Sequence, residues 1–250
     1  MNPYSEYHEE FSRSGFVRLK GYLPPEKVGN LEKNLQRYIC EIVPGLPPTD
    51  VFYEIQGRSE TLKQLFRMEQ HDSFFHSITS LSKFSRLAEA LLDTPVVLKG
   101  VEMFNKPAGI GKPTPPHQDG YYFCLAPSQA VTLWLPLDPV SEENGCIRYT
   151  RGSHRNGIRA HQASNILGFS QGLIDWGPED KAAEVKAVAS PGDLLAHHCD
   201  IIHRADANPS QISRRALAMV YYAADSVIDE AAQARYNQSS TAQRIDLQSP

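Results

Sequence analysis

Hydrophobic positions recur at helical spacing in the first third of the chain. After Pro24-Pro25, apolar residues every three or four positions predict a helix that runs to Ile42. A shorter helix is expected over residues 4–14, and an alternating strand over residues 15–19. Helical periodicity also predicts helices over residues 61–75 and 81–92.

From Val96 the pattern changes to short strand-like segments separated by Gly, Pro and Asn turns. The segments cover residues 96–104, 130–138, 146–149, 194–197 and 215–222. Short strands with no helix between most of them are typical of an antiparallel double sheet or barrel. The pattern therefore predicts a mainly β fold with flanking helices and a double-stranded β-helix (jelly roll, cupin-like) core.

The chain shows no internal repeat and no interdomain linker, so a single domain over residues 1–250 is expected. Residues 1–95 would form a mostly helical support, and residues 96–225 the β-helix core. Alternation lapses over residues 152–186, which are glycine-rich and are interpreted as a loop insertion over the pocket mouth. Residues 226–250 are polar and are expected to form a short helix and a C-terminal tail.

Composition narrows the choice of partners. The hydrophobic content is 41% and the net charge is −4, without a long run of one sign. These values give no reason to expect nucleic-acid or membrane binding, and favour a small-molecule substrate. The four cysteines are far apart, and neither a signal segment nor an apolar run of membrane-spanning length is present. A soluble cytoplasmic protein is expected, and the oligomeric state stays open.

Candidate metal ligands are concentrated in the β region. His117 and Asp119 are two residues apart and would share one face of a strand, so both could reach one metal ion. His203 offers a third ligand. Two His and one carboxylate on one side of a metal leave open positions, as in non-haem Fe(II) oxygenases. His197 and His198 compete for the third place.

An arginine follows eleven residues after His203, a spacing that neither competing histidine has. Arg214 opens a strand, and its guanidinium could hold a dicarboxylate through two parallel hydrogen bonds. Small residues at 216 and 218 share its face and would leave room for such a ligand. Arg215 would point to the opposite face.

Together these residues resemble the phytanoyl-CoA dioxygenase family of Fe(II)/2-oxoglutarate oxygenases. The resemblance is carried by Phe11, Gly15-Phe16-Val17, His117-Gln118-Asp119, Trp134 to Asp138, Asn144 to His154, Pro191-Gly192-Asp193, and His203 to Ala216. It implies that His117, Asp119 and His203 hold Fe(2+). It further implies that Arg214 binds 2-oxoglutarate, with Ser210, Trp134 and Lys99 near that cosubstrate.

The resemblance also implies the reaction. An enzyme of this kind uses O2 and 2-oxoglutarate to oxidise a substrate C–H bond, with release of succinate and CO2. Related halogenases carry Gly or Ala where this chain has Asp119, so hydroxylation is favoured, with demethylation and desaturation still open. A cupin-like hydrolase or isomerase would leave Arg214 unexplained. A non-catalytic binding domain would be marked by loss of a ligand, yet all three are present. The sequence does not name the substrate.

Overall fold

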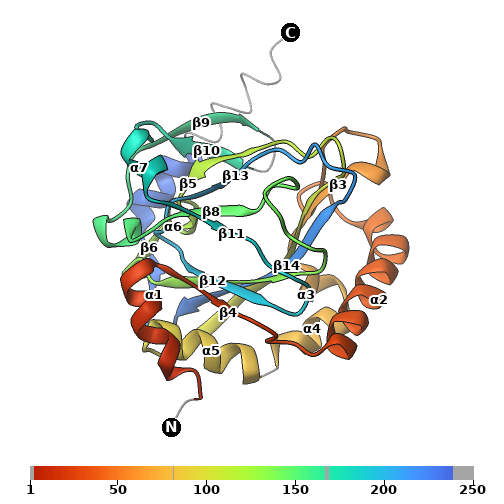
Figure 1. Ribbon diagram of the computed structural model, residues 1–250, viewed down its shortest axis with the longest axis horizontal. Coiled ribbons are helices and arrows are strands. Elements are labelled where there is room, and N and C mark those ends of the chain that lie inside the picture. The colour runs from red at the N-terminus through yellow and green to blue at the C-terminus, as the bar shows by residue number, and fades with distance from the viewer. Residues whose placement is uncertain (1–2, 81, 167–168, 239–250) are drawn as a thin grey trace.

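Two antiparallel sheets face each other in the computed structural model, which describes residues 3–80, 82–166 and 169–238 (Figure 1). The larger sheet contains, in spatial order, β1 (Phe16–Leu19), β12 (Leu194–His198), β7 (Ala130–Pro136), β14 (Arg214–Ala223), β4 (Val96–Lys106), β3 (Leu62–Leu65) and β2 (Val51–Tyr53). The smaller sheet contains β11 (Glu184–Ala187), β8 (Ile147–Thr150), β13 (His203–Ala205) and β5 (Thr114–His117). The predicted mainly β fold is confirmed.

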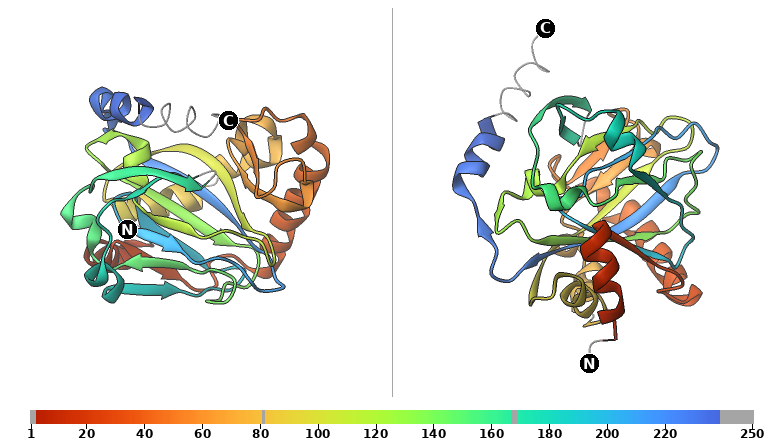
Figure 2. Two further views of the ribbon diagram at one scale, coloured as in Figure 1. Left: turned by 90° about the horizontal axis from the view of Figure 1, so that it is seen from above. Right: turned by 60° about the vertical axis from the view of Figure 1, so that its left-hand side comes forward.

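Alternation along the central strands gives the larger sheet two different faces. Leu133 and Leu217 belong to the core on its outer face, and Trp134 and Ala218 to a second core between the sheets. Helices cover the outer face: α1 (His8–Ser14), α2 (Pro25–Glu41), α3 (Met68–His71), α4 (Ser73–Thr79) and α5 (Ser82–Leu92) (Figures 1 and 2). The inner face is therefore the one that remains for a ligand.

The long helix α2 lies where its sequence pattern predicts it. Pro25 occupies its first turn, where a missing backbone N–H costs nothing. Its buried side chains, Val28, Leu31, Leu35 and Tyr38, follow helical spacing. Short 3-10 turns complete this part of the chain: η1 (Ser5–Tyr7), η2 (Val43–Gly45) and η3 (Ser59–Thr61).

The helix predicted over residues 61–75 is wrong in its first part. Residues 62–65 form β3, which pairs with β4 through Gln64 and Leu65, and only α3 and α4 follow as helices. Leu62 and Leu65 are three residues apart, a spacing that suits a helix, but all four residues of β3 are buried, so both faces of the strand are covered. The free edge of β4 offers backbone partners to this segment, and tertiary pairing decides between the two.

The segment 152–186 is more regular than the loop that its sequence suggests. It contains η4 (Ser153–Asn156), α7 (Pro178–Ala182) and a hairpin of β9 (His161–Ile166) and β10 (Phe169–Leu173). The hairpin lies beside β5 (Figure 1), and the Tyr122 hydroxyl donates to the carbonyl of Gln171 at 2.7 Å. Gly172 packs on Pro115, so a glycine that suggested a loop instead permits close packing against β5.

The C-terminal part begins with a small two-stranded sheet. β15 (Val227–Ile228) pairs with β6 (Leu125–Ala126), and residues 230–238 are helical. Residues 239–250 of the expected tail, Leu81 of the expected helix and Gly168 of the expected loop lie outside the described residues. Within the described ranges, no helix combines the length and apolarity needed to cross a bilayer.

Candidate metal centre

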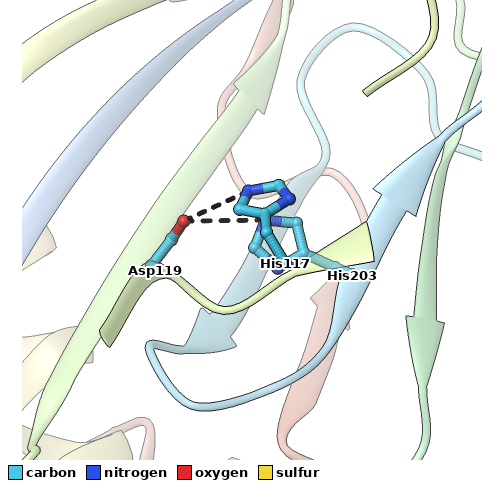
Figure 3. Close-up of side chains that lie close together, drawn as sticks. All are labelled: His117, Asp119 and His203. Carbon is cyan, nitrogen blue, oxygen red and sulfur yellow. Dashed lines mark ion pairs between the residues drawn. The ribbon is translucent and has the colours of Figure 1, made fainter. Parts of the chain in front are cut away.

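Three predicted ligands lie side by side at one end of the smaller sheet. β5 and β13 are neighbours, and His117 and His203 are direct partners in their pairing. Asp119 begins α6 (Asp119–Phe123), directly after β5. Ligand atoms of the three side chains all lie within 4.8 Å of one another. Figure 3 shows the carboxylate turned toward both imidazole rings.

The two histidines present the ring nitrogen that a metal needs. His117 Nδ1 donates to the carbonyl of Pro115 at 2.8 Å, and His203 Nδ1 donates to that of Ile201 at 3.1 Å. The lone pairs are therefore on Nε2, which lies 3.6 Å from Asp119 Oδ1 in His117 and 3.7 Å in His203. Burial, with His117 close by, lowers the pKa of His203 to about 3. These residues fit a divalent ion held by two nitrogens and one oxygen.

Asp119 does not reach the histidines by strand alternation, so that part of the prediction is wrong. The strand ends at His117, Gln118 is still extended, and Asp119 is the first helical residue. Gln118 fixes this corner, because its side-chain amide donates to the carbonyls of Asp200 at 2.6 Å and Gly157 at 2.9 Å. The i and i+2 side chains converge because the chain bends.

The second oxygen of Asp119 has its own partners on the larger sheet. The Thr132 hydroxyl donates to Oδ2 at 3.2 Å, and His197 Nε2 donates to the same oxygen at 3.3 Å. The Tyr149 hydroxyl lies 3.0 Å from His197 Nδ1. Burial alone would raise the pKa of Asp119, but the neighbouring imidazoles of His203, His117 and His197 hold it well below the usual value.

A cavity of about 100 Å³ extends from these ligands across the inner face of the larger sheet. Arg214 and Trp134 line it, with the guanidinium carbon 5.2 Å from the centre of the indole ring. Arg214 is 5% exposed, and its Nε has no hydrogen-bond partner among the described residues. A buried guanidinium with an unpaired N–H is costly, so this end of the cavity suits a carboxylate.

Lys106 is a second basic residue beside Arg214, although the cavity lining does not include it. It is the direct cross-strand partner of Arg214, and burial together with Arg214 lowers its pKa to about 6. Its ammonium donates to the carbonyl of Lys112 and lies 3.4 Å from the Thr114 hydroxyl. The strand recognised in the sequence ends at Phe104, so Lys106 was not among the predicted site residues. Continued alternation from Phe104 would have placed Lys106 on the inner face.

Two other predicted residues are not brought to the cavity. The Ser210 hydroxyl donates to Asn208 Oδ1 at 2.7 Å, within the loop before β14. Lys99 is exposed, with its ammonium 5.9 Å from the centre of the Tyr222 ring. The cavity lining includes neither residue.

The competing residues have other roles. His198 Nδ1 accepts from the backbone N–H of Asp200 at 3.0 Å, although His198, Cys199 and Asp200 also come together as possible ligands. Arg215 points away from the cavity and forms ion pairs with Asp138 at 2.6 Å and Glu32 at 3.4 Å. Arg214 and Arg215 thus lie on opposite faces of β14, as alternation predicts.

Comparison with known proteins first defines the class of fold. EvdO2 from Micromonospora carbonacea var. aurantiaca, solved in complex with 2-oxoglutarate, matches with a TM-score of 0.70 and 25% identity over 88% of this chain and 90% of that chain. EctD from S. alaskensis, solved with 2-oxoglutarate and 5-hydroxyectoine, matches with a TM-score of 0.74 and 17% identity over 89% and 78%. The fold is the jelly roll of these enzymes.

The sequence matches the family profile described as phytanoyl-CoA dioxygenase (PhyH) over residues 11–216, and the chain belongs to this family. Phytanoyl-CoA dioxygenase of Arabidopsis thaliana is 34% identical over 156 residues, covering 61% of this chain and 53% of that protein. A probable alpha-ketoglutarate-dependent hypophosphite dioxygenase of Stutzerimonas stutzeri is 25% identical over 89% of this chain and 79% of its own length. The chain spans about half the length of several curated relatives that it matches.

Proposed function

We propose that the protein is a non-haem Fe(II)- and 2-oxoglutarate-dependent dioxygenase that hydroxylates a small organic substrate and releases succinate and CO2. One observation carries this proposal. His117, Asp119 and His203 lie in the same cavity as Arg214, whose Nε has no partner. A metal site joined to a carboxylate site is what a chelating keto acid requires.

The roles follow from the contacts. His117, Asp119 and His203 would hold the iron, which when bound supplies the activation of O2 that is coupled to decarboxylation of the keto acid. Arg214 would bind the distal carboxylate of 2-oxoglutarate, with Lys106 beside it and Trp134 as the wall below. Burial of the Arg214 guanidinium strengthens its attraction for the carboxylate. Ser210 and Lys99 lie outside the cavity, so no direct contact with the cosubstrate is assigned to them.

Similar proteins support the cosubstrate. EvdO2 was solved with 2-oxoglutarate, and the epimerase SnoN, 21% identical, with Fe3+, alpha ketoglutarate and nogalamycin RO. A cupin-like hydrolase or isomerase that uses no keto acid would supply no cosubstrate carboxylate for the buried Arg214 to bind. The carboxylate at Asp119 favours hydroxylation over halogenation.

The test is succinate formation from 2-oxoglutarate, measured with and without Fe(II) and O2 over a panel of small organic compounds. We expect succinate only when both are present, and more of it when a substrate is added. Asp119→Ala should abolish turnover, because removal of the only oxygen ligand weakens iron binding. Near-normal succinate release by that variant would refute the assignment of the metal centre.

We also infer a cytoplasmic location. All four cysteines are free, and Cys124, Cys146 and Cys199 are buried. Burial raises the pKa of each of these three thiols and so disfavours the reactive thiolate. Free thiols are the normal state in a reducing compartment.

A further inference from the structure

Building on the proposed function, we propose that the substrate carries a cationic nitrogen and that the Glu102 carboxylate binds it. Glu102 lies on β4 and lines the cavity. It is the cross-strand partner of Ala218, which is in turn the partner of Trp134, so these residues form one row across the inner face. A carboxylate in this row faces the space that a substrate must enter.

Glu102 has no partner of its own. Among the residues that the structure describes, none donates a hydrogen bond to its carboxylate or forms an ion pair with it. The two nearest cations are otherwise placed: Arg67 forms an ion pair with Asp50, and Lys99 is exposed beside Tyr222. Glu102 is half-buried, so in this narrow cavity its carboxylate is only partly hydrated, and no donor among the described residues makes up for the water that it loses. A cation supplied by a ligand would compensate for that loss.

The cavity is electrically polarised along its length. Arg214 and Lys106 pair at one end, and Glu102 lies four residues further along both strands, a separation of roughly 13 Å. The metal position is beside the Glu102 end, because Thr132, which donates to Asp119, is in the row next to Trp134. The ion that Asp119 would hold offsets the charge of that carboxylate, so Glu102 is the acidic group at this end that remains for a substrate. The basic end suits the anionic cosubstrate, and the acidic end suits a ligand of opposite charge.

Two further observations agree with a cation at this end. Burial, Asp119 and Glu69 raise the pKa of Glu102 to about 8, as expected for a carboxyl group that lacks a counter-ion, so a bound ammonium group would favour release of its proton. Phe104 and Phe123 line the same cavity, and aromatic rings attract ammonium groups. The class that fits is a small amine rather than an anionic thioester or a neutral alcohol.

The experiment uses the Co(II)-loaded protein saturated with 2-oxoglutarate, under argon. The probes are n-butylammonium, 1-butanol and butyrate, which share one carbon chain and differ in charge. Binding is followed by broadening of the probe methyl signal in NMR, which requires proximity to the paramagnetic ion. We expect butylammonium to bind at least ten times more tightly than the other two. Glu102→Gln should remove that preference, whereas Glu143→Gln, which removes an exposed carboxylate, should keep it.

Each possible result of the probe-binding experiment either supports or overturns the proposed role of Glu102. Equal or tighter binding of 1-butanol or butyrate, a preference that survives in Glu102→Gln, or no binding of butylammonium would each overturn the proposal. Chelation of 2-oxoglutarate, seen in the visible spectrum of the same sample, tests the proposed function separately. A chelate without ammonium preference would refute only the role of Glu102.

Discussion

His197 donates from Nε2 to Oδ2 of Asp119 at 3.3 Å, whereas both proposed histidine ligands face the other oxygen, Oδ1. The two oxygens of one carboxylate are therefore divided between a histidine on β12 and the candidate metal position. Because a carboxylate can only accept, His197 must donate from Nε2, and its Nδ1 is left to accept from the Tyr149 hydroxyl. His197 is in this account a positioning residue that fixes the orientation of Asp119.

Replacing His197 should weaken metal binding without removing a ligand. In His197→Phe, Oδ2 of Asp119 keeps only the Thr132 hydroxyl, so the carboxylate can rotate away from the metal. Loss of such an outer contact costs about tenfold to a hundredfold in metal affinity. The measurement is a Co(II) titration that follows the visible absorption of the bound ion, with a change in band shape expected as well as in affinity.

The matched control is His198→Phe, the next residue on the same strand, whose ring contacts the N–H of Asp200 rather than Asp119. The control should bind Co(II) with wild-type affinity and spectrum. Identical curves for both variants would show that His197 does not position Asp119.

Arg214→Gln should raise the 2-oxoglutarate concentration that gives half-maximal succinate release. Truncating one partner of a buried charge pair costs about 2–5 kcal/mol, so an increase of roughly thirtyfold or more is expected. Arg215→Gln removes the same charge on the opposite face and breaks the pair with Asp138, so it should lower stability and leave this concentration unchanged. An equal effect of the two variants on this concentration would contradict the proposed role of Arg214.

Lys106 should make the metal-free protein more stable as pH rises. Its pKa is about 6 in the folded state and ordinarily 10.5, so between these values the unfolded chain binds more protons than the folded one. The contribution of Lys106 to the free energy of unfolding should therefore increase from about pH 6 to 10.5 and stay constant outside that range, whereas Glu102, with a pKa of about 8 in the folded state, opposes it below pH 8. Lys106→Met should flatten this part of the profile, as measured by urea denaturation across pH. An unchanged slope would mean that Lys106 is charged in the fold.

Hydrophobic periodicity predicted the elements that the core requires. α2 and the central strands β7 and β14 combine many consecutive positions of one pattern, and burial enforces that pattern. Where the spacing of apolar residues suited a helix, as at Leu62 and Leu65, a strand formed instead because the segment pairs with the edge of β4. Local sequence carries no information about that edge.

The candidate site was predictable in its ligands and less so in its surroundings. His117, Asp119, His203 and Arg214 come together in one cavity, and their spacing had suggested a common site. Oδ1 of Asp119 faces the two histidine ligands, and Oδ2 faces His197 on β12. This arrangement depends on how the two sheets face each other, which the sequence of a single strand does not determine. Glu102 looked unremarkable in sequence, because its significance comes from the partners that it lacks.

The most direct test of the account is an anaerobic titration. Fe(II) is added to the protein, and 2-oxoglutarate is then titrated in while the visible spectrum is recorded. We expect a weak charge-transfer band that saturates with 2-oxoglutarate, as chelation at an iron with open positions requires. In Arg214→Gln, saturation of this band should need a far higher 2-oxoglutarate concentration. Bound Fe(II) without such a band would contradict the account, and would favour a metal-dependent hydrolase or isomerase that uses no cosubstrate.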